Sequence, residues 1–204
     1  MKGAGSGPDR ETCEGVAFAA RLLAAAGLVT AFGHVSARRD GGFAITSTDP
    51  LGDARADRVV SVADDGTPLS NADSAPLEVA MHTAVYAARP DVGAICRTHS
   101  PALAAAGARG LAPAQAHGLG GLAGDVRLFT EPELVTDAAG GAALAAALGD
   151  GDCLVIAANG GLATGPALGP ACIAAYYLEE RCAVALAGGP PDAELAAEQR
   201  AARA

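Results

Sequence analysis

The residues best able to do acid–base chemistry lie in a short part of the chain, between positions 78 and 99. Glu78 and His82 are four residues apart in a stretch with helical periodicity, which places both on one face of the expected helix. His99 ends the β-prone segment that follows, a position from which side chains commonly project into a crevice. A carboxylate and an imidazole that meet in a crevice can carry protons to and from a substrate. The structural alternative stays open: Glu78 would favour the helix start, His82 would pack in the core and His99 would close the strand.

The other two of the four histidines, His34 and His117, lie outside this part of the chain. For His34 we expect a hydrogen bond to a substrate oxygen or an acid–base role, and the alternative is a bond to the backbone. His117 lies in the glycine-rich residues 116–124, which predict a loop near the mouth of the pocket. A contact between His117 and substrate and a purely structural position for His117 both stay open. Tyr176 or Tyr177 would bring a hydroxyl group to the site if its side chain faces the sheet.

Segments of helical and strand-like pattern alternate along the chain and must position these residues. Apolar residues recur at intervals of three and four in the expected helices, and short β-prone runs bounded by turn residues mark the expected strands. The expected helices are residues 11–26, 77–88, 100–108, 136–148 and 170–186, and the expected strands are 29–37, 42–46, 58–63, 92–98 and 153–158. The sequence therefore predicts an α/β or α+β fold around a mixed sheet. We expect a single domain, 1–204, whose ends (1–10 and 188–204) are flexible or peripheral.

Composition argues against several classes of protein. Half of the 204 residues are apolar, which is enough for a core and argues against disorder. The net charge of −9, with no basic cluster, argues against a nucleic-acid partner. No apolar run reaches the roughly 20 residues that span a bilayer, and the polar start has no signal-peptide pattern, so we expect a cytoplasmic protein without a membrane partner. The five widely spaced cysteines predict buried, reduced thiols.

Several segments together resemble the class II aldolase/adducin family over residues 11–187. They are Gly-His-Val-Ser-Ala-Arg at 33–38, Phe-Ala-Ile-Thr at 43–46, the helix–strand block at 76–100, the stretch 155–165 and Tyr-Leu-Glu-Glu-Arg-Cys at 177–182. The resemblance implies a three-layer α/β/α class II aldolase-like fold with a central, mostly antiparallel sheet. It also implies a homotetramer, with active sites between subunits that process a small-molecule substrate. In the family, a divalent metal held by three histidines polarises a carbonyl group, and the helix glutamate, Glu78 here, moves protons.

This sequence departs from the family pattern at two of the three metal ligands. The His-x-His pair of the family reads Arg-Thr-His at 97–99, and its Asn-His-Gly turn reads Asn-Gly-Gly at 159–161. Arginine stays protonated and cannot coordinate a cation, and glycine offers only its backbone. His99 is then the only remaining ligand of a degraded triad, so we expect no cofactor, with zinc, manganese or iron as the alternative. Arg97 would replace the charge of the metal and hold an anion, or else form a structural salt bridge. Substituting Arg97→His together with Gly160→His is expected to restore metal binding.

The groups that hold a phosphate in sugar-phosphate aldolases of the family are also altered. The Gly-Asn-x-Ser turn reads Gly-His-Val-Ser and ends at Ser36, the threonine-rich turn begins Thr46-Ser47, and Pro-Leu replaces the Ser-Ser pair before the glutamate. Fewer hydroxyl groups and an added carboxylate, Asp49, argue against a phosphorylated substrate. These turns look more like the subgroup of decarboxylases and oxidative enzymes of aminocoumarin biosynthesis, which suggests secondary metabolism. The residues expected to contact substrate are His34, Ser36, Thr46, Ser47, His117 and Asn159.

Two functions from different classes follow. The favoured one is a lyase-type enzyme that cleaves a carbon–carbon bond or transfers a proton through an enolate, on a small unphosphorylated carbonyl or carboxylate compound. Glu78 would carry the proton, His99 would be a second acid, base or electrophile, and Arg97 would hold the anion. Decarboxylase or oxygenase chemistry is a variant of this function. The second function is a non-catalytic binding or scaffolding subunit, which is how adducins use the fold.

Overall fold

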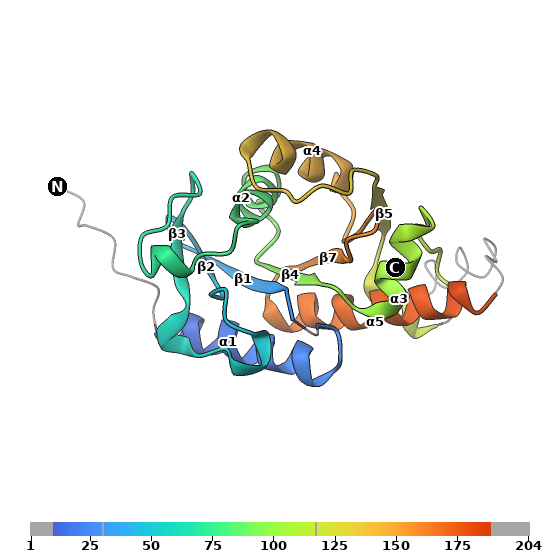
Figure 1. Cartoon of the computed structure of the whole chain (residues 1–204), viewed down its shortest axis with the longest axis horizontal. Helices are drawn as coiled ribbons and strands as arrows, with labels where there is room; N and C mark the ends of the chain where they lie inside the picture. The colour runs from blue at the N-terminus through green and yellow to red at the C-terminus, as the bar shows by residue number, and fades with distance from the viewer. Residues whose placement is uncertain (1–9, 30, 117, 189–204) are drawn as a thin grey trace.

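The strands of the protein form one mixed sheet. The computed structural model describes residues 10–29, 31–116 and 118–188, and within them seven strands pair in the order β3-β2-β1-β4-β7-β6-β5 (Figure 1). The strands are β1 (His34–Arg39), β2 (Gly42–Ile45), β3 (Val60–Ala63), β4 (Ala94–Thr98), β5 (Val126–Phe129), β6 (Cys153–Ile156) and β7 (Gly161–Gly165). Within this sheet only β5 and β6 pair in parallel. The prediction of a mostly antiparallel sheet is therefore confirmed.

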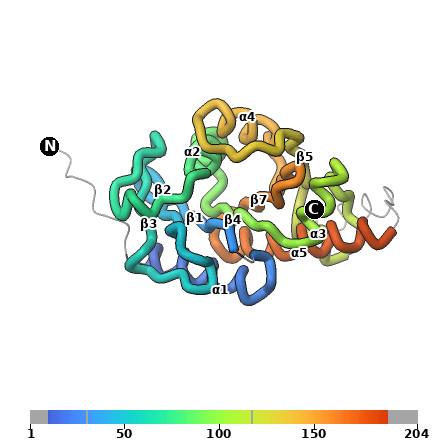
Figure 2. Tube along the Cα trace, in the orientation of Figure 1, coloured from blue at the N-terminus to red at the C-terminus, as the bar shows by residue number. Residues whose placement is uncertain are grey.

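Helices cover both faces of the sheet (Figures 1 and 2). The helices are α1 (Arg10–Ala25), α2 (Val79–Ala88), α3 (Pro101–Ala108), α4 (Ala138–Leu148) and α5 (Leu168–Leu186). α1, α3 and α5 pack on one face around Val35 and Leu178, and α2 and α4 pack on the other around Ile95 and Leu144. The expected three-layer α/β/α arrangement is confirmed. Within the described ranges, no helix is both long and apolar enough to cross a bilayer.

The alternation of side chains along two central strands decides which residues share a face. In β1, Val35 packs in the core beneath α1 and α5, while Ser36 contacts α2 on the opposite face. In β4, Cys96 packs toward α5, and the next residue, Arg97, faces the α2 layer. His34 and Arg97 are register partners in the antiparallel pairing of β1 with β4. The sheet thus brings side chains from two distant parts of the sequence beneath the start of α2.

The start of α3 is capped by a carboxylate from α5. Glu179 accepts hydrogen bonds from the backbone N–H groups of Ala102 and Leu103, at 2.9 and 2.7 Å, and from the hydroxyl of Ser100 at 2.6 Å. These N–H groups have no partner within their own helix, so the carboxylate satisfies donors that would otherwise lie unpaired. Glu179, within the segment 177–182 that carries part of the resemblance, therefore has a structural task.

The structure differs from the sequence-based expectation in several elements. β5 and β7 were not expected as strands, and residues 119–123 form a short 3-10 helix where a loop was expected. α2 begins at Val79 rather than at residue 77, because Glu78 adopts φ −89° and ψ 25° as the N-cap. The expected flexible ends fall mostly on residues 1–9 and 189–204, which lie outside the described residues, as does His117.

Candidate active site

Glu78 points into the protein from the N-cap of α2. Its side chain is 9% exposed and does not cap its own helix. One carboxylate oxygen, Oε1, accepts a hydrogen bond from the backbone N–H of Val135 at 3.4 Å. The other, Oε2, lies 3.3 Å from Nε2 of His34 and 3.6 Å from Nε of Arg97. The carboxylate therefore faces the end of β4 and does not act merely as a charge at the helix start.

Arg97 is the largest fully buried side chain of the protein's described part. Its Nη1 donates hydrogen bonds to the carbonyl oxygens of Thr98 at 2.9 Å and Gly161 at 3.4 Å. Within the same part of the chain, Nε and Nη2 have no hydrogen-bond partner, although Glu78 lies close enough to Nε for an ion pair. Burial lowers the pKa of Arg97 to about 10, and the charge of Glu78 opposes this shift. Arg97 therefore stays a cation at neutral pH, with donors left to bind an anion.

The charges of this group keep the carboxylate ionised and the imidazoles neutral. Burial alone would raise the pKa of Glu78, but the hydrogen bond from His34 and the positive charge of Arg97 lower it to about 2. Burial lowers the pKa of His34, and the nearby Arg97 acts in the same direction. Burial also lowers the pKa of His82 well below its ordinary value. At neutral pH the site thus holds one anion, one cation and two neutral imidazoles.

His99 lies at the edge of the same group and is half-buried. Its Nδ1 contacts the carbonyl oxygen of Phe32 at 3.0 Å, and its Nε2 lies 3.2 Å from Oδ1 of the Asn159 amide. Burial and then the charge of Arg97 lower the pKa of His99 to about 4, so the ring is neutral. A neutral ring that donates from Nδ1 to Phe32 accepts at Nε2, and the Asn159 amide can turn its N–H toward that nitrogen. His99 and Asn159 are therefore brought together beside Arg97.

Gly160, at the position of the third family histidine, leaves no room for a side chain. It lies in the β6–β7 turn with φ +69°, a conformation that L-residues rarely adopt. A Cβ atom built there would overlap the carbonyl oxygen of Thr98 and would lie 3.0 Å from Nη1 of Arg97. The guanidinium thus fills the space next to the missing side chain. This backbone argues against the expectation that Arg97→His with Gly160→His restores the triad, because a histidine could enter at Gly160 only if β4 or the turn moved.

The remaining donors do not fit the divalent metal that the fold family implies. Within the described ranges, no three His, Cys, Asp or Glu side chains form a group that could hold a metal ion. His99 and Glu78 lie near a buried guanidinium, whose charge would repel a cation placed between them. A catalytic zinc normally has three protein ligands. A divalent metal ion would therefore lack its usual ligands at this site.

The other residues expected to contact substrate have partners within the protein. The hydroxyl of Thr46 accepts a hydrogen bond from the backbone N–H of Val35 at 3.2 Å. Ser47 donates to Asp49 at 2.8 Å, and Asp49 also pairs with Arg58 at 3.1 Å. These contacts place the threonine-rich turn in its own hydrogen-bond network.

Ser36 is fully buried, and its contacts join His82, which the sequence left between core and site, to Tyr86, which sequence reasoning missed. Its hydroxyl lies 2.7 Å from Nδ1 of His82 and 2.8 Å from the hydroxyl of Tyr86. His82 is buried, as the core interpretation predicts, but it also contacts His34 at 2.7 Å. Tyr86 was not singled out, although Glu78, His82 and Tyr86 follow one another at intervals of four. That spacing was the available signal, because it puts all three on one helix face.

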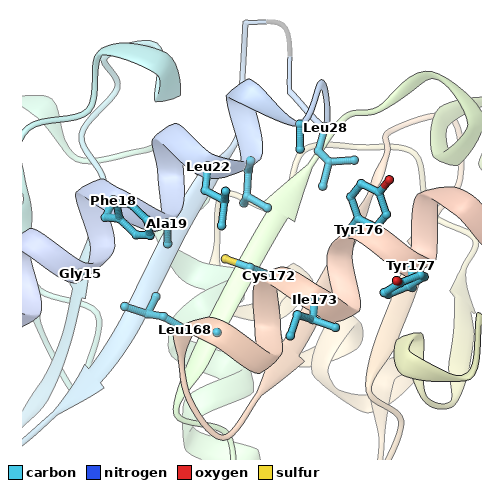
Figure 3. A pocket seen from close by; sticks show the side chains of 13 residues that line it. Gly15, Phe18, Ala19, Leu22, Leu28, Leu168, Cys172, Ile173, Tyr176 and Tyr177 are labelled. Atoms are coloured by element: carbon cyan, nitrogen blue, oxygen red, sulfur yellow. The ribbon is translucent and has the colours of Figure 1, made fainter. Parts of the chain in front are cut away.

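An apolar pocket lies on the opposite face of the sheet, between α1 and α5 (Figure 3). Its volume is about 570 Å³, and Phe18, Leu22, Ile173, Tyr176 and Tyr177 are among the residues that line it. The expectation that Tyr176 or Tyr177 brings a hydroxyl to the acid–base site is wrong, because both tyrosines line this pocket and α5 covers the face away from α2. The ring of Tyr176 meets that of Tyr177 edge-on, with centroids 5.3 Å apart.

The layers and the sheet order define a three-layer α/β/α fold with a central, mostly antiparallel sheet. The comparison with protein families identifies the family. Residues 14–186 match the Class II Aldolase and Adducin N-terminal domain, so the chain belongs to this family. No curated protein matches the chain in a sequence comparison.

Solved structures agree with this assignment. An aldolase II superfamily protein from Pseudomonas syringae matches with a TM-score of 0.80 and 26% identity, over 96% of this chain and 84% of its own. YgbL from Klebsiella pneumoniae, provisionally assigned as an aldolase/epimerase/decarboxylase, matches with a TM-score of 0.79 and 26% identity, over 93% and 98%. The L-fuculose 1-phosphate aldolase from Glaciozyma antarctica PI12 shares the fold, with a TM-score of 0.76 and 23% identity over 97% and 85%.

Proposed function

We propose that this protein is an enzyme that generates an enolate from a small, unphosphorylated carbonyl or carboxylate compound without a metal triad. The observation that carries the proposal is Arg97, a fully buried guanidinium with two nitrogens that lack hydrogen-bond partners in the described part of the chain. Buried donors in native proteins are nearly always paired. A substrate carboxylate or carbonyl oxygen would pair with them, directly beside the carboxylate of Glu78.

The chemistry divides between these two side chains. Glu78 would remove a proton from the carbon next to the substrate carbonyl, and the electron pair of the broken C–H bond would move onto the carbonyl oxygen. Arg97 would stabilise the negative charge on that oxygen. Cleavage of a neighbouring carbon–carbon bond delivers an electron pair to the same enolate, so epimerisation, retro-aldol cleavage and decarboxylation share one intermediate. His99, beside Arg97, would supply the second proton transfer.

The low pKa of Glu78 fits this role once a ligand is considered. A carboxyl group with a pKa of about 2 is a weak base, and the positive charge of Arg97 contributes to that low value. A substrate anion bound to Arg97 would offset this charge and raise the pKa of Glu78 toward the range of an effective general base. Binding of the anion would thus activate the base, and an enzyme without bound substrate would keep Glu78 inert.

We also propose a homo-oligomer, expected as a tetramer. Phe18, Leu22, Ile173 and Tyr176 are 62, 47, 48 and 47% exposed, and they gather on neighbouring surfaces of α1 and α5 (Figure 3). Contiguous exposed apolar side chains of this kind are typical of association surfaces. A second copy of the chain would cover them.

The experiment follows the carbon acid directly. Exchange of the proton next to the carbonyl would be followed in D2O by proton NMR, for a panel of small 2-oxo and 2-hydroxy carboxylates. Glu78→Gln should lower exchange by about 10²- to 10⁴-fold, because it keeps the shape and removes the base. Arg97→Met should raise KM for the carboxylate if Arg97 binds the ground state, and lower turnover if it stabilises the enolate. Glu133→Gln, the same change at an exposed position, is the matched control.

The result also separates the enzyme from a binding subunit. Exchange that is catalysed by the native chain and unchanged in Glu78→Gln and Arg97→Met would contradict the proposed site. Tight binding of a carboxylate with no exchange in the native chain would favour the non-catalytic alternative.

A further inference from the structure

Five buried side chains form an unbroken series of polar contacts between β1 and α2. His34 Nε2 lies 3.3 Å from Glu78 Oε2, and His34 Nδ1 lies 2.7 Å from His82 Nε2. His82 Nδ1 lies 2.7 Å from the hydroxyl of Ser36, which lies 2.8 Å from the hydroxyl of Tyr86. All five residues are at most 7% exposed. The series combines residues two apart on the strand with residues four apart on the helix.

The protonation states give this series one direction. An ionised carboxylate only accepts, so Nε2 of His34 must carry the proton that it donates to Glu78. A neutral imidazole has one N–H, so Nδ1 of His34 accepts from Nε2–H of His82. Nδ1 of His82 then accepts from the hydroxyl of Ser36, which in turn accepts from the hydroxyl of Tyr86. Each hydrogen bond therefore points toward Glu78, and no other pattern satisfies all four contacts while that carboxylate is charged and both imidazoles are neutral.

We propose that His82, with Ser36 and Tyr86 behind it, is a positioning residue that holds His34 neutral, in the tautomer whose Nε2–H donates to Glu78. This inference rests on the proposed role of Glu78 as the base. It assigns His34 as a fixed donor to the base, where the sequence left open an acid–base role or a bond to substrate.

The physical reason is competition for Nδ1 of His34. That nitrogen would have to gain a proton for His34 to become an imidazolium, which would force His82 into its Nδ1–H tautomer and reverse the hydrogen bonds with Ser36 and Tyr86. Burial and the charge of Arg97 disfavour the charged form of His34, whereas Glu78 favours it. Without the donor of His82, Glu78 would draw a second proton onto His34. A charged His34 would hold the carboxylate more tightly and weaken it as a base.

The test compares two substitutions of the same residue. The amide of Gln can reach the position of the imidazole Nε2 and donate to His34, so His82→Gln keeps the donor. His82→Leu has similar bulk and no donor. The side-chain nitrogen-15 shifts of the four histidines report their tautomers and charge, and each signal is assigned by a single His→Gln variant. This measurement needs no substrate and uses the full chain.

In the native chain we expect His34 and His82 both as Nε2–H tautomers, each with a pKa below the ordinary histidine value. His82→Leu should raise the pKa of His34 by about one unit or more, whereas His82→Gln should leave it in place. With a substrate from the exchange panel, His82→Leu should lower kcat about tenfold with little change in KM, and His82→Gln should restore it. The rescue distinguishes positioning from simple packing.

Two results would overturn the inference. One is an Nδ1–H tautomer at His34 or His82 in the native chain, which remains informative even if His82→Leu does not fold. The other is the same titration of His34 in both variants. Failure of the proposed function has a different signature: the tautomers would be as expected, while Glu78→Gln would leave proton exchange intact.

Discussion

The substitution Gly160→Ala tests whether the backbone of the β6–β7 turn excludes a side chain next to Arg97. An alanine at φ +69° costs about 1–2 kcal/mol relative to glycine, because its Cβ crowds the backbone in the left-handed region. The overlap with the carbonyl oxygen of Thr98 adds about 1–3 kcal/mol, the usual cost of forcing extra volume into a packed site. The sum predicts that Gly160→Ala lowers the free energy of unfolding by about 2–5 kcal/mol.

Gly110 supplies the matched control. It has a similar φ of +64°, but a Cβ there would meet nothing within 4 Å. Gly110→Ala should therefore cost only the backbone contribution, about 1–2 kcal/mol, and the difference between the two variants measures the steric contribution at Gly160. Urea unfolding followed by far-UV circular dichroism gives both values. Equal losses in the two variants would refute the reasoning.

The lack of space for a side chain at residue 160 also limits any attempt to rebuild the metal site. Arg97→His with Gly160→His should be strongly destabilised and should gain no tight zinc binding in a calorimetric titration, since the imidazole has no room at residue 160. Arg97→His alone separates the effect of the arginine from that of the turn. A folded double variant that binds one equivalent of zinc would show that the turn adapts, and would contradict the exclusion.

Two further predictions concern pH and assembly. Burial lowers the pKa of His34 and of His82, so the unfolded chain binds protons near pH 6.5 that the folded chain does not. The free energy of unfolding should therefore decrease as the pH falls below about 6.5, by up to about 1.4 kcal/mol per pH unit for each histidine. Urea unfolding from pH 7.5 to 5 measures this slope, and His82→Gln should reduce the slope. A free energy of unfolding that does not change with pH would contradict the prediction. The lowered pKa of Glu78 acts in the same direction at lower pH, since its stabilising contribution is complete above about 4.5 and is lost as the pH falls toward about 2. Sedimentation should show a homo-oligomer at micromolar concentration, and Phe18→Asp with Ile173→Asp should shift it toward the monomer; a monomeric native chain would contradict the proposed assembly.

Local sequence patterns were sufficient for the order of most elements. The helical spacing of residues 77–88 predicted α2 to within two residues, and the run of residues before His99 predicted β4. β5 and β7 were missed because each is a strand of four or five residues whose pairing partners, not its own pattern, define it. Glycines open and close β7, and glycine is a poor indicator of strand structure on its own.

The sequence also identified the chemical groups of the site, but not their mutual arrangement. Glu78, Arg97 and His99 were found from residue type and from the resemblance. Helical and strand periodicity act over a few residues, so they place each residue on its own element and do not say which elements meet. The contact of His34 with Glu78 joins residues 44 positions apart, and it exists because β1 pairs with β4 in one register beneath α2. A shift of that register by one residue would turn His34 and Ser36 to the opposite face.

Tertiary structure alone decided the state of Arg97 and of Gly160. The sequence showed an arginine in place of a metal ligand and a glycine in place of another, as two separate departures. The fold makes them one arrangement, in which the guanidinium lies against a turn that has no space for a Cβ and keeps two nitrogens without hydrogen-bond partners in the described part of the chain. Whether a buried charge is paired depends on atoms that come together only when β4, β7 and the start of α2 pack.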